Sequence, residues 1–390
     1  MSATPAFQGF RRPDGQVGVR NHVLVVPTVI CSAVVTERIA AAVPGAVALP
    51  HLAGCGQLGP DMQLTHETLA AYCRHPNVGA VLVVALGCEQ VVGQMLTEAA
   101  KSAGKPSALV SIQGEGGTPR ATARGTELAR EMAAGLASEP RETCSIEELV
   151  LSLKCGGSDY TSGLSANPAL GRVADRLHDF GAATVLGEIA EILGAEHLLA
   201  ARAEKPEVAS RLLRVINRVE SEAQALGLDI RGTQPAPGNI RGGLTTIEEK
   251  SLGATYKSGE TSPLVDVVAY AGRITRKGLT VMDTPGLDVE AVTGMVGGGA
   301  QVVVFTTGLG TPTGNPIAPV IKITGNARTA KTMADNTDLD VSGILEEHEP
   351  IDSAADRLFA EILAVCSGKE TAAERLGHRE FAIHRRNPTI

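Results

Sequence analysis

The chain has 390 residues, 43% of them hydrophobic and 20% charged, which is enough for two or more domains with their own cores. Its formal net charge of −8 argues against a nucleic-acid partner, which would favour a basic face. Residues 1–20 lack an apolar core and no run approaches the ~18 residues of a membrane helix, so we predict neither signal peptide nor membrane span. Seven cysteines without a secretory signal predict free thiols or metal ligands in the cytoplasm.

The first part of the chain alternates apolar β-rich runs with helical patterns. The predicted strands cover 22–30, 46–50, 80–85 and 107–112, and the predicted helices cover 32–43, 61–74, 89–103 and 120–137. A polar connector at 138–146 follows. We therefore predict a first α/β domain over 1–140 that carries Cys55 and Cys88.

The second part repeats this pattern. The predicted strands cover 148–153, 183–186, 279–283 and 301–306, and the predicted helices cover 168–180, 206–226, 245–252 and 352–366. Glycine-rich loops at 230–262 and 306–316 interrupt it. We predict a second α/β domain over 141–390 that carries Cys155 and these loops, and parallel sheets covered on both faces in both domains.

Three cysteines follow strand-like runs and have glycine neighbours: Cys55, Cys88 and Cys155. Because the carboxyl ends of parallel strands share one edge of a sheet, these thiols can converge. Thiolates suit zinc or iron–sulfur centres, and three ligands would leave one metal position open. Taken singly, each could be an ordinary buried cysteine. Cys31 also follows a strand, and we interpret it as a core residue rather than a fourth ligand.

Polar residues on glycine-rich loops are the candidates for binding a small hydroxylated acid. They are Ser158, Asp159, Ser162, Asn167, Asn239, Thr307, Thr311 and Thr313. The first four precede or open a helix, where free N–H groups favour anions, although ordinary helix capping would use the same residues. His51, Glu188 and Lys250 are the candidates for proton transfer, and no order among them follows from the sequence.

Several long motifs resemble the altronate/galactarate dehydratase family. They are GQVGVRNHV, AGCGQ, LGCEQ, KCGGSDYTSGLSANPALG, EIAEILGAEHLL, PGNIRGGLTTIEEKSLGA, DTPG and FTTGLGTPTGNPIAP, and the likeness extends from about residue 9 to residue 382. The resemblance implies an iron-dependent lyase with Cys55, Cys88 and Cys155 as iron ligands, as Fe2+ or as an iron–sulfur cluster. Full-length members carry an extra small amino-terminal domain, so the resemblance also implies a separate small subunit and an oligomer.

The implied reaction is dehydration of a sugar acid, such as altronate or galactarate, to a 2-keto-3-deoxy acid. An alternative is the large subunit of (2R)-sulfolactate sulfo-lyase, which would release bisulfite and pyruvate, and the GHREFAI tail suits that branch. A non-catalytic scaffold subunit and a zinc hydrolase are further alternatives, although zinc hydrolases usually use histidine or carboxylate ligands.

Overall fold

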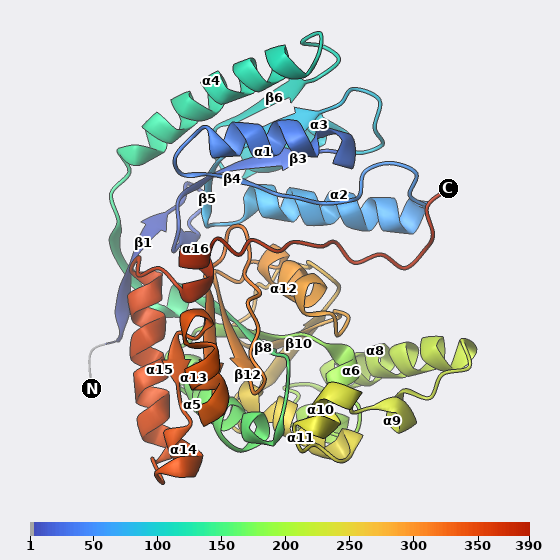
Figure 1. Ribbon diagram of the computed structural model, residues 1–390, viewed down its shortest axis with the longest axis vertical. Coiled ribbons are helices and arrows are strands. Elements are labelled where there is room, and N and C mark those ends of the chain that lie inside the picture. Colours follow the sequence, from blue (N-terminus) through green and yellow to red (C-terminus); the bar gives the residue numbers. More distant parts are fainter. Residues whose placement is uncertain (1–3) are drawn as a thin grey trace.

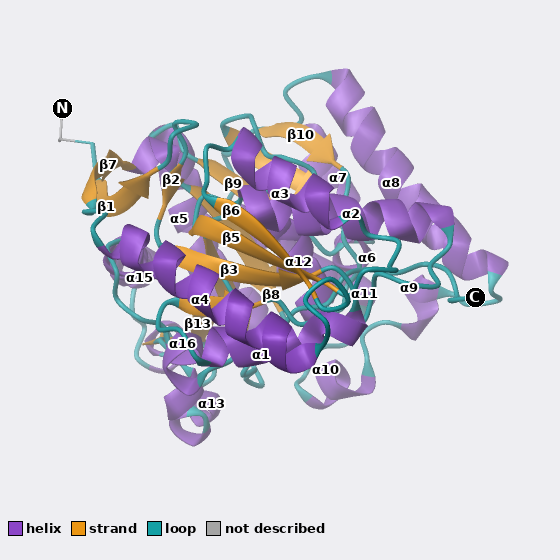
Figure 2. Cartoon of the chain, turned by 90° about the horizontal axis from the view of Figure 1, so that it is seen from above, coloured by secondary structure: helices purple, strands orange, loops and turns teal. Residues whose placement is uncertain are grey.

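The computed structural model describes residues 4–390, and its first sheet is parallel and four-stranded, in the order β4-β3-β5-β6. The strands are β3 (His22–Pro27), β4 (Ala46–Ala48), β5 (Val78–Ala85) and β6 (Ser107–Ser111). Helices α1 (Ala33–Ala41) and α4 (Thr118–Ala137) pack on one face, and α2 (Gly59–Arg74) and α3 (Gly93–Ser102) on the other (Figures 1 and 2). β5 is apolar on both sides because both of its faces are buried.

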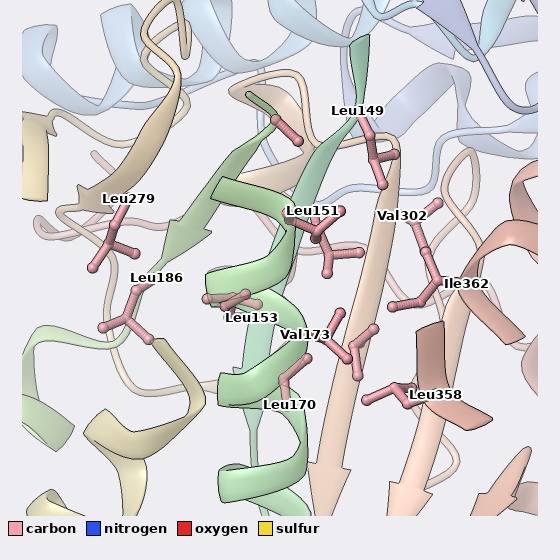
Figure 3. Close-up of a cluster of buried hydrophobic side chains, with 14 of the residues drawn as sticks. Leu149, Leu151, Leu153, Leu170, Val173, Leu186, Leu279, Val302, Leu358 and Ile362 are labelled. Carbon is pink, nitrogen blue, oxygen red and sulfur yellow. The ribbon is translucent and has the colours of Figure 1, made fainter. Parts of the chain in front are cut away.

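The second sheet has seven parallel strands in the order β10-β11-β9-β8-β12-β13-β14. They are β8 (Val150–Cys155), β9 (Ala183–Leu186), β10 (Leu264–Val268), β11 (Gly278–Met282), β12 (Val302–Thr307), β13 (Val320–Thr324) and β14 (Leu339–Asp340). On one face, α5 (Asn167–Asp179) and α15 (Ile351–Cys366) bury their apolar sides, and Val173 and Ile362 join Leu151 of β8 and Val302 of β12 in one hydrophobic cluster (Figure 3). The other face packs against α12 (Asp288–Gly297). The predicted α/β fold is confirmed.

A third sheet was not predicted. β1 (Ala6–Arg11) pairs antiparallel with β2 (Val17–Gly18) and with β7 (Glu142–Ser145), and β7 lies inside the segment that we expected to be a connector. β7 has no apolar run because only Cys144 of its four residues is buried. The predicted boundary at residue 140 lies between α4 and β7. β1 belongs to the first predicted domain, but it pairs with β7 of the second.

Further helices surround the second sheet. They are α6 (Ile189–Ile192), α7 (Glu196–Ala201), α8 (Pro206–Ala225), α9 (Ile230–Thr233), α10 (Pro237–Arg241), α11 (Ile247–Thr255), α13 (Ala327–Thr332), α14 (Gly343–Glu346) and α16 (Ala372–Leu376). The segment 230–262, which we expected to be mainly loop, therefore contains three of these helices. No helix within residues 4–390 is both long and apolar enough to cross a membrane.

The two large sheets share one hydrophobic cluster. Val292 and Val296 of α12 pack in the same cluster as Leu69 of α2 and Phe305 of β12. The carboxyl-terminal tail crosses from one unit to the other below α2 (Figure 1). The N–H groups of Arg386 and Asn387 donate to the Asp61 carboxylate (3.0 and 2.8 Å), and the Ile390 N–H donates to the Gly56 carbonyl (2.8 Å).

Each parallel sheet contains a point where the chain reverses its direction of winding. In the seven-stranded sheet, β8 lies between β9 and β12. In the four-stranded sheet, β3 lies between β4 and β5. Crevices beyond the carboxyl ends of strands at such points are the usual ligand sites of open α/β sheets. The fold therefore offers two positions for a site, one for each sheet.

Candidate active site

At the carboxyl end of β8, Lys154 occupies a fully buried position in the middle of the second sheet. Its Nζ donates to Glu188 Oε1, to Asp288 Oδ1 (2.6 Å) and to the Cys155 carbonyl (2.6 Å), and it lies 5.0 Å from the centre of the Phe305 ring. A buried ammonium group needs such partners because burial of an unpaired charge costs several kcal/mol. The strand therefore places a fixed positive charge at the switch point.

Glu188 follows β9 and is the residue before α6, and its backbone is left-handed (φ 64°). In any residue other than glycine, this backbone conformation costs about 1–2 kcal/mol. The turn is held by the Glu188 N–H, which donates to Thr284 Oγ1 at 2.6 Å. Strain at a buried carboxylate is typical of functional sites.

Cys155 and Lys257 complete a compact buried group. The Cys155 thiol donates to Glu191 Oε2 (3.0 Å), and Lys257 Nζ donates to Cys155 Sγ (2.7 Å). Lys257 Nζ also lies 3.6 Å from Oε2 of Glu188 and 3.6 Å from Oε2 of Glu191. We call Lys154, Cys155, Glu188, Glu191 and Lys257 the Cys155 cluster. It joins the ends of β8 and β9 to the short helical turn after α11.

The two carboxyl groups of this cluster have very different pKa values. Burial, reinforced by the charge of Glu191, raises the pKa of Glu188 to about 7. Although burial favours the neutral acid, Lys257 and Lys250 hold the pKa of Glu191 down at about 2. Such a pair supplies one group that is always ionised and one that can gain or lose a proton near neutral pH.

The cysteine and the lysines of the cluster have the complementary protonation states. Burial raises the pKa of Cys155 to about 12, so its sulfur carries a proton at neutral pH. Burial favours the neutral amine of Lys154 and Lys257, but the neighbouring anionic groups raise the pKa of both lysines above the ordinary value. Both lysines are therefore positively charged.

A pocket of about 230 Å³ adjoins the cluster. Five of the predicted site residues line it: Ser158, Asp159, Ser162, Asn167 and Lys250. Lys250 Nζ lies 3.7 Å from Glu191 Oε1 and donates to Gln234 Oε1 (3.2 Å). The Glu191 side chain is 11% exposed and that of Glu188 is completely buried, so Glu191 is the carboxylate that connects the cluster to the pocket, through Lys250.

Within the pocket wall, the Asp159 carboxylate accepts several hydrogen bonds that hold the loop in place. Oδ1 accepts from the Thr161 hydroxyl (2.6 Å) and the Ser162 N–H (3.0 Å), and Oδ2 accepts from Asn326 Nδ2 (2.7 Å). The loop that follows β12 passes so close that a Cβ at Gly308 would lie 2.0 Å from this carboxylate. Asp159 therefore fixes the pocket loop against the next strand end.

Gly308→Ala is expected to destabilise the protein by about 1–3 kcal/mol, because the added methyl group must displace the Asp159 carboxylate from its donors. Urea unfolding measures this change. Gly286→Ala is the matched control, since a Cβ there meets nothing within 4 Å. Equal stability of the two variants would contradict the role given to Asp159.

The other predicted binding residues lie beside the pocket or away from it. Asn239 Nδ2 donates to the Ser158 carbonyl (2.9 Å), so it supports the pocket loop. Thr307 Oγ1 accepts from the Gly310 N–H (2.9 Å). The hydroxyls of Thr311 and Thr313 lie 3.0 Å apart and hydrogen-bond to each other. A direct role of these four residues in substrate binding stays a prediction.

His51 belongs to a different place in the molecule. Its Nε2 bonds to the Pro27 carbonyl (2.7 Å) and its Nδ1 accepts from the Ala53 N–H (3.2 Å), while burial lowers its pKa. It lines a pocket of about 260 Å³ together with Gln57, Glu290 and Phe381. Both ring nitrogens are engaged by the backbone, so the structure gives no support to His51 as a base, and that role stays a prediction.

The three cysteines predicted as metal ligands occupy two separate environments. Cys155 is buried in the cluster above, whereas Cys55 and Cys88 are exposed at the edge of the first sheet. Among residues 4–390, the only group of three cysteine, histidine or carboxylate ligands whose atoms lie within 4.8 Å of one another is Cys155, Glu188 and Glu191. Cys31 is exposed, so its interpretation as a core residue is wrong. Its strand ends three residues earlier than expected, at Pro27.

Four residues of the site were not among the predicted ones: Lys154, Glu191, Lys257 and Asp288. A lysine inside the apolar run ELVLSLKC was a signal for Lys154, because a lysine in a doubly buried strand must be paired. Glu191 lies three residues after Glu188, on the same side of a helical turn. Nothing local marks Lys257 or Asp288, which reach the cluster through tertiary packing.

Two family models match the chain. Residues 146–389 match the D-galactarate/altronate dehydratase carboxyl-terminal domain, and residues 9–137 match the second domain of D-galactarate dehydratase/altronate hydrolase. The chain belongs to the D-galactarate/altronate dehydratase family. The site lies in the part that matches the carboxyl-terminal model, and the exposed cysteines lie in the part that matches the second-domain model. The predicted family is thereby confirmed, and because the relatives described next are dehydratases and a sulfo-lyase, the predicted lyase class is confirmed too.

Individual relatives differ in how much of their own length this chain covers. It is 39% identical over 380 residues to (2R)-sulfolactate sulfo-lyase subunit beta of Chromohalobacter salexigens, covering 97% of both chains. It is 35% identical to altronate dehydratase of Bacillus subtilis, where the match covers 98% of this chain and 78% of the relative. It is also 35% identical to galactarate dehydratase (L-threo-forming) of Escherichia coli, covering 97% of this chain and 76% of the relative.

Proposed function

We propose that this protein is a β-eliminating lyase that dehydrates a sugar acid, such as altronate or galactarate, to a 2-keto-3-deoxy acid. The observation that carries the proposal is the Glu188–Glu191 pair, whose pKa values of about 7 and about 2 are set by buried lysines beside a polar pocket. Elimination next to a carboxylate needs a base for the α-proton and positive charge for the enolate that forms. The cluster contains both.

In this mechanism the substrate carboxylate binds to the Lys250 ammonium group, which reaches the pocket. The α-proton leaves toward the Glu188–Glu191 pair, and Glu188 holds it because its pKa is the higher of the two. Lys257, 3.6 Å from both carboxylates, stays charged and stabilises the developing negative charge. The β-hydroxyl leaves as water by taking up the proton that Glu188 holds, and the resulting enol tautomerises to the 2-keto acid.

Iron is the proposed cofactor, and it would supply Lewis-acid assistance to the departing group. The Cys155 cluster fits an iron ion poorly. Lys257 Nζ lies 2.7 Å from Cys155 Sγ and Lys154 Nζ bonds to Glu188, so ammonium groups already occupy the positions where a cation would neutralise these ligands. An iron site is therefore better sought at the other predicted ligands.

A second candidate function is supported by the relative that this chain matches over nearly the whole length of both proteins. The chain covers 97% of the sulfo-lyase subunit beta but only 76–78% of the two dehydratases described above. We therefore also consider elimination of bisulfite from (2R)-sulfolactate, with a separate small subunit. The chemistry at the α-carbon is the same, and only the leaving group differs.

The test is incubation of the protein with altronate, galactarate and (2R)-sulfolactate, each with assays for 2-keto acid and for sulfite. Keto acid without sulfite supports the dehydratase, and both products together support the sulfo-lyase. Neither product, also after addition of a co-expressed small subunit, would favour a scaffold role and contradict the proposal.

The rate below neutral pH should follow the ionisation of Glu188. We expect kcat/KM to rise about tenfold per pH unit up to about pH 7 and then to level, because the base must be ionised. Glu191→Gln should move the bend to lower pH, since removal of a neighbouring negative charge makes Glu188 easier to ionise. Glu196→Gln, on α7, is the control and should leave the bend in place; an upward shift for Glu191→Gln would contradict the assignment.

A further inference from the structure

Three of the seven cysteines are exposed, and all three lie at one edge of one sheet. Cys31 follows β3, Cys55 follows β4 and Cys88 follows β5, whereas Cys73, Cys144, Cys155 and Cys366 are buried. Free cysteine is among the residues most often buried, so three exposed thiols on neighbouring strand ends need an explanation. This edge is the switch point of the four-stranded sheet.

The loops that carry these cysteines are bonded to one another. The Ile30 N–H donates to the Ala53 carbonyl (3.1 Å), and the Gln90 N–H donates to the Gly54 carbonyl (3.1 Å). Each of these four residues lies within two positions of one of the cysteines. At Gly54, a Cβ would lie 2.2 Å from the Thr28 carbonyl, so only glycine lets the Cys55 loop approach the Cys31 loop this closely.

The Cys88 loop is also held rigidly. The Glu89 carboxylate accepts from the Thr28 hydroxyl, from the Leu86 N–H (3.2 Å) and from the Gly87 N–H (2.6 Å). The loop is thereby fixed to the end of β3. The three cysteines are therefore presented by one preorganised surface rather than by three independent loops.

The three sulfur atoms have no partner of their own. Within residues 4–390, no hydrogen bond to Sγ of Cys31, Cys55 or Cys88 is formed, in contrast to Cys155, which is held by Lys257. Exposed apolar residues lie on the same loops and at the helix starts that follow them: Ile30, Val34, Leu52, Val92 and Met95. Exposed thiols without a hydrogen-bond partner suit a soft metal group.

We propose that Cys31, Cys55 and Cys88 bind an iron–sulfur cluster as three thiolate ligands. Iron–sulfur clusters are held by cysteine thiolates, and here three exposed thiols follow three neighbouring strands of one sheet. Three protein ligands leave one iron of a four-iron cluster open.

The experiment is anaerobic reconstitution of the full chain with Fe2+ and sulfide, followed by analysis of iron, acid-labile sulfide, zinc and the visible spectrum. We expect about four iron and four sulfide per chain in the unaltered protein. Cys31→Ser, Cys55→Ser and Cys88→Ser should each lose most of both, while Cys155→Ser should retain them. Circular dichroism should show that all four variants are folded.

Full iron and sulfide in Cys31→Ser, their loss in Cys155→Ser, or zinc in place of iron would overturn the proposal. The readout uses no substrate, so it is separable from the proposed lyase function on which the purpose of the cluster rests. A reconstituted cluster in a protein inactive on all three acids would reject the function alone. Lyase activity in a protein that takes up neither iron nor sulfide on reconstitution would reject the cluster alone.

Discussion

Lys154→Met is expected to lower the free energy of unfolding by about 3–5 kcal/mol at pH 8. The substitution leaves the completely buried Glu188 carboxylate without its closest partner, and removal of one member of a buried ion pair has a cost of this size. Urea unfolding measures the loss. It should be smaller at pH 5.5, because Glu188, with a pKa of about 7, can then become neutral by taking up a proton.

Two further variants separate this effect from general damage. Lys331→Met, on the exposed side of α13, should change stability by no more than about 0.5 kcal/mol. Addition of Glu188→Gln to Lys154→Met should recover part of the loss, because it removes the buried charge. If Lys154→Met were as stable as the surface variant at pH 8, the account of the cluster as a charge-balanced unit would be wrong.

Glu188→Gln should reduce kcat about 10²–10⁴-fold, the range for removal of a general base. The amide is nearly the same size, and Lys154 keeps Asp288 as a partner, so thermal unfolding should show an intact fold. Steady-state kinetics, with whichever of the three acids the product assays identify as the substrate, measure this reduction. Glu196→Gln is again the matched control, and a Glu188→Gln enzyme with unchanged kcat would exclude Glu188 as the base.

The fold could be predicted from the sequence wherever a strand is buried on both faces. β3, β5, β8 and β12 are long apolar runs, and their alternation with helices gave the parallel architecture correctly. β1 and β7 escaped prediction because only two residues of β1 and one of β7 are buried, which leaves no apolar run in either strand.

The candidate site could be predicted only in part. Strand ends and glycines marked where the sites would lie, and Lys250 and the loop around Asp159 do line one pocket, next to the cluster that contains Glu188. The three metal ligands were assumed to share one edge, but the chain contains two parallel sheets with one switch point each. Sequence gives the strand end for each cysteine, whereas the assignment of strands to sheets depends on which strands pair.

Lys257 shows why the rest could not be read from the sequence. It lies 102 residues from Cys155, in a turn whose pattern differs little from the polar segments around it. Its burial follows from packing of α11 and this turn against α5. A charged residue of this kind can be recognised only when its distant partners are already placed.

The hydrophobic cluster shared by the two large sheets has a consequence for how the protein melts. Val292 and Val296 of α12 close the layer below α2, so neither half has a complete interior without the other. We infer that the halves unfold in a single cooperative transition. A molecule that binds only at the Cys155 cluster would then also protect the four-stranded sheet, because it stabilises the one native state that both halves share.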